Sequence, residues 1–146
     1  MLLPVIELEG ISSLAVSTLL ERTQQRGIRL TGVLSHQFTV NEADSLLSVY
    51  QHVVENYGEM LLQYASGKSL IFEFHHEDQP VVPMMREIVG PKMIGYAIKL
   101  RPDSLRGKFV FKNKSNDAFI EAFHCTDLET DGILEAKYVF EDLGSN

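Results

Sequence analysis

Strand-like and helix-like segments alternate along the chain, and this alternation constrains its fold more than any other feature. Short apolar segments rich in β-branched and aromatic residues predict strands at 3–8, 28–38, 70–74 and 118–123. Apolar residues spaced by three and four predict helical regions at 12–26, 41–64, 81–89 and 128–143. We therefore predict an α+β fold of the ferredoxin-like split βαβ type, with helices packed on a four-stranded antiparallel sheet.

Local signals place the expected ends of these helices. Ser12 and Ser13 are suited to cap the first helix and Asn41 to cap the second helical region, because their side chains accept hydrogen bonds from backbone N–H groups. Gly27 and Gly90 are expected to end helices, since glycine adopts the left-handed conformation there. The region 41–64 fits either one amphipathic helix or a helical hairpin.

The stretch 91–114 lacks a clear period. Pro91, Gly95, Pro102 and Gly107 interrupt it, so we expect irregular structure there. Irregular stretches of this length inside a compact domain are usually functional or take part in assembly.

Length and charge restrict the classes of function. The 146 residues fit a single domain over 1–146. Lys and Arg number 13 against 20 Asp and Glu, and the net charge of -7 argues against nonspecific binding of nucleic acid, which depends on basic side chains. No apolar run approaches the ~20 residues that span a bilayer, so we expect no membrane partner. The single cysteine, Cys125, excludes an intramolecular disulfide and suits a cytoplasmic location.

Two short motifs suggest ligands but fit simpler interpretations. The sequence Ser66-Gly67-Lys68-Ser69 ends like a phosphate-binding P-loop, yet the required first glycine is replaced by Leu62, so we predict a turn. His75 and His76 are adjacent, and neighbouring side chains on an extended segment point to opposite sides, which disfavours a shared metal ion. We expect a solvated loop there.

The segment His124-Cys125-Thr126-Asp127 lies between a predicted strand and a predicted helix, where α/β proteins often place reactive side chains. Glu135 follows in the last helix. If this helix packs back along the strand, the carboxylate can orient the imidazole and leave the other ring nitrogen as a nucleophile. A loop or capping histidine is the common alternative, and Cys125 is a second candidate nucleophile.

Two arginines flank the irregular stretch. Arg86 and Arg106 would suit phosphate oxygens if their guanidinium groups converged on one pocket. Exposed, solubilising arginines are the simpler interpretation.

The chain resembles the nucleoside diphosphate kinases over nearly its whole length. The resemblance rests on a set of matching segments: RGIRLTGV at 26–33, the turn at 66–67, MMREIVGP at 84–91, SLRGKF at 104–109 and FHCTDLETDGILEAKYVFEDL at 123–143. Within the family, HCTDL and VYQHVVENYGEM look most like the second kinase domain of an axonemal branch with two kinase domains.

The resemblance implies ping-pong transfer of a γ-phosphate between nucleotides. His124 would carry the phosphate, and Glu135 would orient it. Arg86 and Arg106 fall where the family places phosphate-binding arginines, and we include Lys92 and Tyr57 among the nucleotide-binding residues. The resemblance also implies Mg²⁺ held mostly by the nucleotide phosphates, with no metal site built from protein ligands alone.

Several family residues are replaced. The family lysine after the first strand is Glu7, its asparagine before the histidine is Glu121, and its threonine beside a phosphate contact is Lys92. We align the family tyrosine near the phosphate with Leu47, or with a neighbour if the alignment slips. Like charges about 4 Å apart cost ~1 kcal/mol in water and ~4 kcal/mol near a protein surface. We therefore expect low or no kinase activity.

Three functions stay open. The first is a degenerate kinase with a structural or microtubule-associated role in the cytoskeleton or flagellar axoneme. The second is an active nucleoside diphosphate kinase working through phospho-His124, and the third is nucleotide sensing without turnover. Partners would be nucleoside di- and triphosphates or axonemal proteins. The sequence leaves open the oligomeric state and whether the chain is complete.

Overall fold

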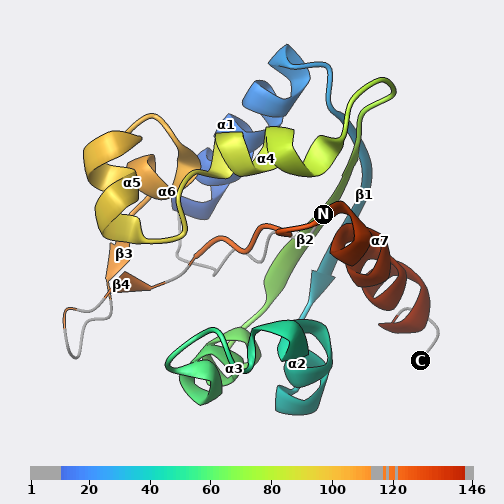
Figure 1. Ribbon diagram of the computed structural model, residues 1–146, viewed down its shortest axis with the longest axis vertical. Helices are drawn as coiled ribbons and strands as arrows, with labels where there is room; N and C mark the ends of the chain where they lie inside the picture. The colour runs from blue at the N-terminus through green and yellow to red at the C-terminus, as the bar shows by residue number, and fades with distance from the viewer. Residues whose placement is uncertain (1–10, 113–116, 118, 121, 144–146) are drawn as a thin grey trace.

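A central antiparallel strand pair organises the structure, a computed structural model that describes residues 11–112, 117, 119–120 and 122–143. Helices α1 and α4 lie at one end of the pair, α2 and α3 at the other, and α7 beside β1 (Figure 1). The helical elements are α1 Ile11–Gln25, α2 Val40–Leu47, η1 Ser48–Tyr50, α3 Tyr57–Ala65, α4 Val81–Val89, α5 Ile94–Leu100, α6 Leu105–Lys108, α7 Glu129–Lys137 and η2 Tyr138–Asp142. The strands are β1 Arg29–His36, β2 Ser69–His75, β3 Phe111–Lys112 and β4 Phe119–Ile120.

The strands form two separate antiparallel pairs within the described residues. β1 pairs with β2 and β3 pairs with β4, so the predicted single four-stranded sheet is not seen there. The predicted strand at 3–8 lies outside the described residues. Of the predicted strand at 118–123, Phe119 and Ile120 form β4, residues 118 and 121 lie outside the described residues, and the Phe123 carbonyl accepts a hydrogen bond from the Arg106 guanidinium at 2.8 Å.

Alternating side chains on β2 separate two hydrophobic cores. Phe72 and Phe74 stack on one face, with centroids 6.1 Å apart, in a core shared with α1 and α4. Ile71 points to the other face and packs with the α2–α3 hairpin and with Val139 of η2. This period of two is what a strand covered on both faces requires. The α+β class predicted from the sequence is therefore correct.

The predicted ends of two helices are confirmed, and the predicted N-terminal caps of two helices are wrong. Gly27 and Gly90 have φ of 69° and 94° and end α1 and α4 as predicted. The cap of α2 is Thr39 rather than Asn41, because Thr39 and Glu42 satisfy each other's backbone N–H groups in a capping box. The first helix begins at Ile11, so the serines expected to cap it lie within its first turn.

Of the remaining helical predictions, one is confirmed and one is corrected. The region 41–64 is a hairpin of α2, η1 and α3, one of the two predicted forms. The stretch 91–114 is not irregular throughout, since it contains α5 and α6. Ser104 begins α6 by accepting a hydrogen bond from the Gly107 N–H at 3.1 Å. Gly107 also permits close contact with α5, because a Cβ there would lie 2.7 Å from the Ala97 carbonyl oxygen.

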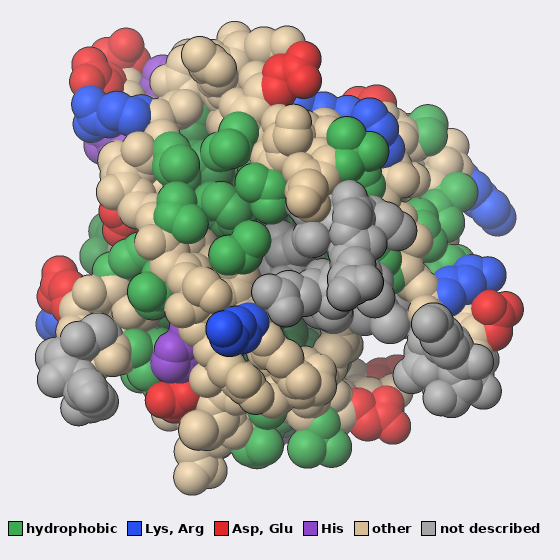
Figure 2. Space-filling model, turned by 180° about the vertical axis from the view of Figure 1, so that it is seen from behind, with side chains coloured by type: hydrophobic (Ala, Val, Ile, Leu, Met, Phe, Trp, Pro, Cys, Tyr) green, Lys and Arg blue, Asp and Glu red, His purple; other side chains and the backbone are tan. Residues whose placement is uncertain are grey.

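The surface carries both apolar and charged groups. Seen from behind, hydrophobic side chains gather on the upper part of the face, and charged side chains of both signs lie mostly near its edges (Figure 2). Among the described residues, no helix has the length and apolarity needed to cross a membrane.

Candidate functional site

His124 lies in a buried segment, residues 122–126, that runs from β4 towards α7. Its side chain is 8% exposed, and its Nε2 atom lies 3.6 Å from Oε1 of Glu135, whose side chain is 6% exposed. The last helix thus packs back along the segment, as the sequence analysis required for these two residues to meet. Because Nε2 faces the carboxylate, Nδ1 is the ring nitrogen that remains for chemistry.

Glu135 is held in place by a second neighbour. The hydroxyl of Thr126, which is fully buried, donates a hydrogen bond of 2.5 Å to Oε2 of Glu135. Cys125 stands between His124 and Thr126 in the sequence, and burial raises the pKa of its thiol to about 12. The reactive thiolate is therefore scarce near neutral pH, which disfavours the alternative in which Cys125 is the nucleophile.

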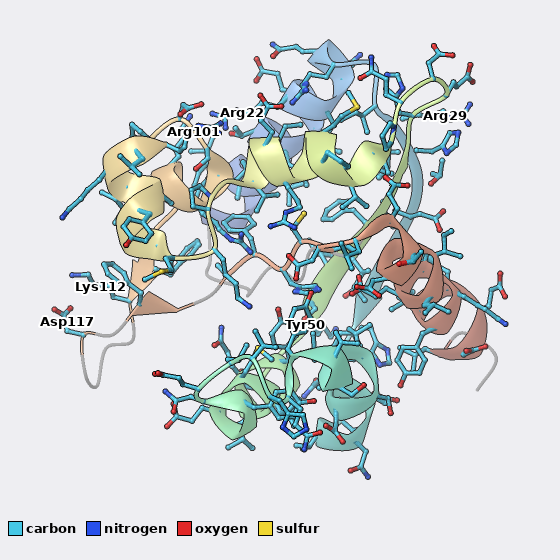
Figure 3. All side chains as sticks on the ribbon, viewed as in Figure 1. Arg22, Arg29, Tyr50, Arg101, Lys112 and Asp117 are labelled. Carbon is cyan, nitrogen blue, oxygen red and sulfur yellow. The ribbon has the colours of Figure 1, made fainter. Side chains whose placement is uncertain are left out.

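Two tyrosines of the α2–α3 hairpin cover the imidazole. The rings of Tyr50 and Tyr64 approach His124 edge-on, with centroids 5.6 Å and 6.4 Å away. Figure 3 shows Tyr50 between the hairpin and the segment that leads into α7. The ammonium of Lys92 lies 4.8 Å from the centroid of the Tyr50 ring, so Lys92 does reach the site. Such a contact between a cation and an aromatic ring is attractive.

Asp127 connects this aromatic cover to α4. Its Oδ2 accepts a hydrogen bond of 2.7 Å from the Tyr50 hydroxyl, and its Oδ1 lies 3.2 Å from Nη1 of Arg86. Burial, followed by the hydrogen bond to Asp127, raises the pKa of Tyr50 well above its usual value, with smaller contributions from Glu135 and Asp131. The hydroxyl therefore remains protonated and donates throughout the physiological pH range.

Both predicted arginines hold the backbone on either side of His124. Arg106, which is buried, donates to the carbonyls of Phe123 at 2.8 Å and Gly90 at 2.9 Å. Arg86, which is half-exposed, donates to the carbonyl of Asp127 at 3.0 Å. The structure therefore brings the two arginines to the histidine segment, where each one is engaged by groups of the protein.

The other predicted residues lie apart from this cluster or outside the described residues. The Tyr57 hydroxyl donates to Oδ1 of Asp44 at 2.6 Å, and no contact found among the described residues joins it to His124. Glu7 and Glu121 lie outside the described residues. His75 ends β2 with an exposed side chain. Groups of three or more potential ligands for a metal ion are absent from the described part of the chain.

The chain is similar in sequence to curated proteins and in fold to solved structures. "Nucleoside diphosphate kinase homolog 7" of Rattus norvegicus and that of Mus musculus are each 34% identical to this chain over 100 residues, or 68% of the chain. The nucleoside diphosphate kinase structure from Aquifex aeolicus superposes with a TM-score of 0.75 at 22% identity, covering 97% of this chain and 95% of that one. The chain belongs to the nucleoside diphosphate kinase family. No protein-family model matches it.

The match to the two curated relatives covers only part of their length. The chain spans about a quarter of the length of the two curated relatives, 24% in each case. The structural likeness confirms the predicted α+β fold, whereas the predicted four-stranded sheet is not confirmed, and the curated relatives confirm the resemblance to the family.

Within this nucleoside diphosphate kinase fold, the sequence analysis missed Tyr50. The tyrosine of the family was aligned with Leu47, but Leu47 is fully buried in the hairpin core and Tyr50 lies against His124. The two positions are three residues apart, and the turn η1 between α2 and α3 decides which of them faces the histidine. A periodicity of 3.6 cannot locate such a turn, although Tyr50 was the nearest tyrosine to the aligned position.

Proposed function

We propose that this chain is a nucleoside diphosphate kinase-fold domain that transfers phosphate weakly or not at all and acts mainly as a structural part of a larger protein or assembly. One observation carries the proposal: both arginines expected at the phosphate are engaged by the protein. Arg106 donates to the carbonyls of Gly90 and Phe123, and Arg86 to the carbonyl and carboxylate of Asp127. A nucleotide phosphate would have to displace these partners.

The local charge supports the same conclusion. Phosphoryl transfer depends on positive charge around the oxygens of the transferring group. The family resemblance places Glu7 where a lysine is expected, a change of two charge units, and adds Glu121 close by. Lys92 offsets part of this change. Each loss of about 1.4 kcal/mol in transition-state stabilisation slows a reaction about tenfold, so several orders of magnitude are at stake.

The structural role includes a proposed association with microtubules in the cytoskeleton or flagellar axoneme. Its support is the relation to homolog 7 and to the two-domain branch of the family. Co-sedimentation with stabilised microtubules tests it directly, with the Aquifex aeolicus kinase as a control of the same fold. If both proteins remain in the supernatant, the proposed microtubule association is wrong.

Labelling with γ-labelled ATP and Mg²⁺ tests the proposed loss of activity. We expect little acid-labile phosphate on the wild-type protein. Any label carried by His124 should be absent from a His124→Ala variant. A Glu7→Lys, Glu121→Asn double variant restores the family residues and should increase the labelling. Strong wild-type labelling that a nucleoside diphosphate removes would refute the proposal, provided that the label is lost in His124→Ala.

A second candidate is a working nucleoside diphosphate kinase. The observation in its favour is that His124, Glu135 and Thr126 are assembled together and buried. In its first half-reaction, the lone pair of Nδ1 would attack the γ-phosphorus, the bond between the β–γ bridging oxygen and that phosphorus would break, and the nucleoside diphosphate would leave. The proton on Nε2 would remain facing Glu135, whose carboxylate stabilises the positive ring.

In that alternative, Mg²⁺ bound to the nucleotide supplies positive charge to the phosphate oxygens. Asp127 is the carboxylate beside Arg86 and Tyr50, and it is already engaged by both. In that alternative the Mg²⁺ ion would therefore be held mainly by the nucleotide phosphates rather than by this carboxylate. The second half-reaction would return the phosphoryl group to a different nucleoside diphosphate, so the label on His124 would be transient.

A further inference from the structure

A crevice of about 230 Å³ lies between α2 with η1 on one side and α7 with η2 on the other, and its lining comes from residues 45–49 and 131–138. Figure 1 shows α7 extending towards the end of the molecule that holds α2 and α3. We propose that this α2–α7 crevice binds a lysine side chain of a partner protein. The inference goes beyond phosphate chemistry, and it rests on the proposed structural role only in naming a protein as the source of the lysine.

The charge of the crevice is negative. Asp131 and Glu135 both line it, since they lie four residues apart on α7 and therefore on the same side of the helix. Glu135 is 6% exposed, and its Oε1 atom accepts no hydrogen bond among the described residues. Asp131 is half-buried. None of the described residues that line the crevice is basic, so the lining itself attracts a cation.

The walls of the crevice are apolar. Leu46 belongs to the hairpin core, whereas Val49 and Leu134 are 59% and 66% exposed. A lysine side chain matches this division, because its methylenes bury against apolar surface while its ammonium meets polar groups. The cavity is smaller than the sites of about 300–1,000 Å³ that hold drug-sized ligands, which favours a single side chain.

The hydroxyl groups of the lining favour an ammonium over a guanidinium. The Ser45 hydroxyl donates to the Asn41 carbonyl at 3.0 Å, so its oxygen keeps lone pairs for an incoming donor. Ser48 adds a second hydroxyl. An ammonium has three donors that separate acceptors can share, whereas a guanidinium is a planar fork suited to a bidentate partner. A metal ion fits less well, because groups of three or more carboxylate, histidine or cysteine ligands are absent from the described part of the chain.

The exposed rim favours a protein as the source of the lysine. A free amine would leave Val49 and Leu134 in water, whereas the neighbours of a lysine in a partner chain would cover them. The two sides of the crevice are already joined, since the Tyr138 hydroxyl donates to the Glu42 carbonyl at 3.5 Å and Val139 is buried in the hairpin core. A partner therefore meets a preorganised site, which lowers the cost of binding.

Peptide binding to the whole chain tests the inference without phosphoryl transfer. Amide shifts of the isotope-labelled protein would be followed by NMR during titration with acetyl-Leu-Lys-Leu-amide. A matched peptide carries norleucine in place of lysine, which keeps the stem and removes the ammonium, and butylammonium supplies the ammonium without a peptide. The protein variants are Asp131→Asn and Leu134→Ala. The control is Glu141→Gln, because it removes the same charge from an exposed side chain of η2 that does not line the crevice.

We expect the lysine peptide to bind the wild type about fivefold more tightly than the norleucine peptide, with the largest shifts in residues of the lining. Asp131→Asn should weaken the lysine peptide about fivefold and leave the norleucine peptide unchanged, as a double-mutant cycle requires for a direct contact. Leu134→Ala should weaken both peptides, and Glu141→Gln should change the affinities less than about twofold. Butylammonium should bind more weakly than the lysine peptide. Circular dichroism would verify that each variant is folded.

Several results would overturn the inference. Equal affinity of the lysine and norleucine peptides would show that the crevice does not recognise an ammonium. An equal loss for both peptides in Asp131→Asn, or a loss as large in Glu141→Gln, would exclude Asp131 as the contact. Butylammonium that binds as tightly as the lysine peptide would assign the crevice to small amines. Strong labelling of the wild type by ATP would refute the proposed function without changing these affinities, so the two failures are distinguishable.

Discussion

The hydrogen bond between Thr126 and Glu135 gives the sharpest prediction for stability. Thr126 is fully buried, Glu135 is 6% exposed, and the bond between them is 2.5 Å long. In a Thr126→Val variant, a methyl group replaces the hydroxyl with little change in volume. The change leaves Oε2 of Glu135 buried without its donor, so the variant loses a charge-assisted hydrogen bond and leaves the acceptor desolvated.

The expected cost follows from the burial of both partners. A hydrogen bond to a charged group contributes about 1.5–3 kcal/mol, and an unsatisfied buried acceptor places this variant towards the upper end of that range. For a domain of about 150 residues, each 1 kcal/mol lowers the midpoint of thermal unfolding by about 2–4 °C. We therefore expect the Thr126→Val midpoint to fall by about 5–10 °C.

Urea and thermal unfolding followed by circular dichroism provide the assay, with Thr31→Val as the matched control. The Thr31 hydroxyl also donates to a glutamate, Oε1 of Glu73 at 2.8 Å, but this pair is exposed. We expect the control to lose less than about 0.5 kcal/mol. If the two variants lose equal stability, the buried bond has no special contribution, and the assigned role of Thr126 in holding Glu135 is wrong.

Three further predictions concern stability. The hydrogen bond from the Thr39 backbone N–H is the main cause that lowers the pKa of Glu42 from its ordinary value of 4.5. The ionised Glu42 therefore stabilises the fold at pH values above 4.5, and this contribution is lost as the pH falls below 4.5. Glu42→Gln should therefore flatten the acid limb of a urea-midpoint titration. Gly90→Ala should cost about 2 kcal/mol or more by chemical denaturation, because φ is 94° and the new Cβ would lie 2.3 Å from Ser104 Oγ. Phe123→Ala should cost about 3–5 kcal/mol in the same assay, since it empties a site that is 2% exposed. A loss below 1 kcal/mol in either variant would contradict the stated cause.

Elements with strong local signals were predicted well from the sequence. The helix at 81–89 matches α4 at both ends, because its apolar residues repeat at helical spacing and Gly90 supplies the left-handed residue that ends it. The strands at 28–38 and 70–74 differ from β1 and β2 by one or two residues at each end. Local propensity and periodicity act within a few residues, so they are readable in the chain itself.

Contacts between distant residues were not readable in this way. The arginines were identified from the sequence, but their partners, the carbonyls on either side of His124, depend on how α4 and α6 pack against the histidine segment. The cap of α2 moved to Thr39 because a reciprocal bond with Glu42 outweighed the propensity of Asn41.

The local sequence therefore determines part of the candidate site, and tertiary packing determines the rest. The local sequence specifies His124 and places Glu135 in the helix that follows it, and the family resemblance gives this pair its expected role. Packing brings the tyrosine of η1 onto the imidazole and sets Asp127 between Tyr50 and Arg86. These contacts join residues dozens of positions apart, and their geometry is set by the burial of apolar surface throughout the fold, which no short stretch of sequence encodes.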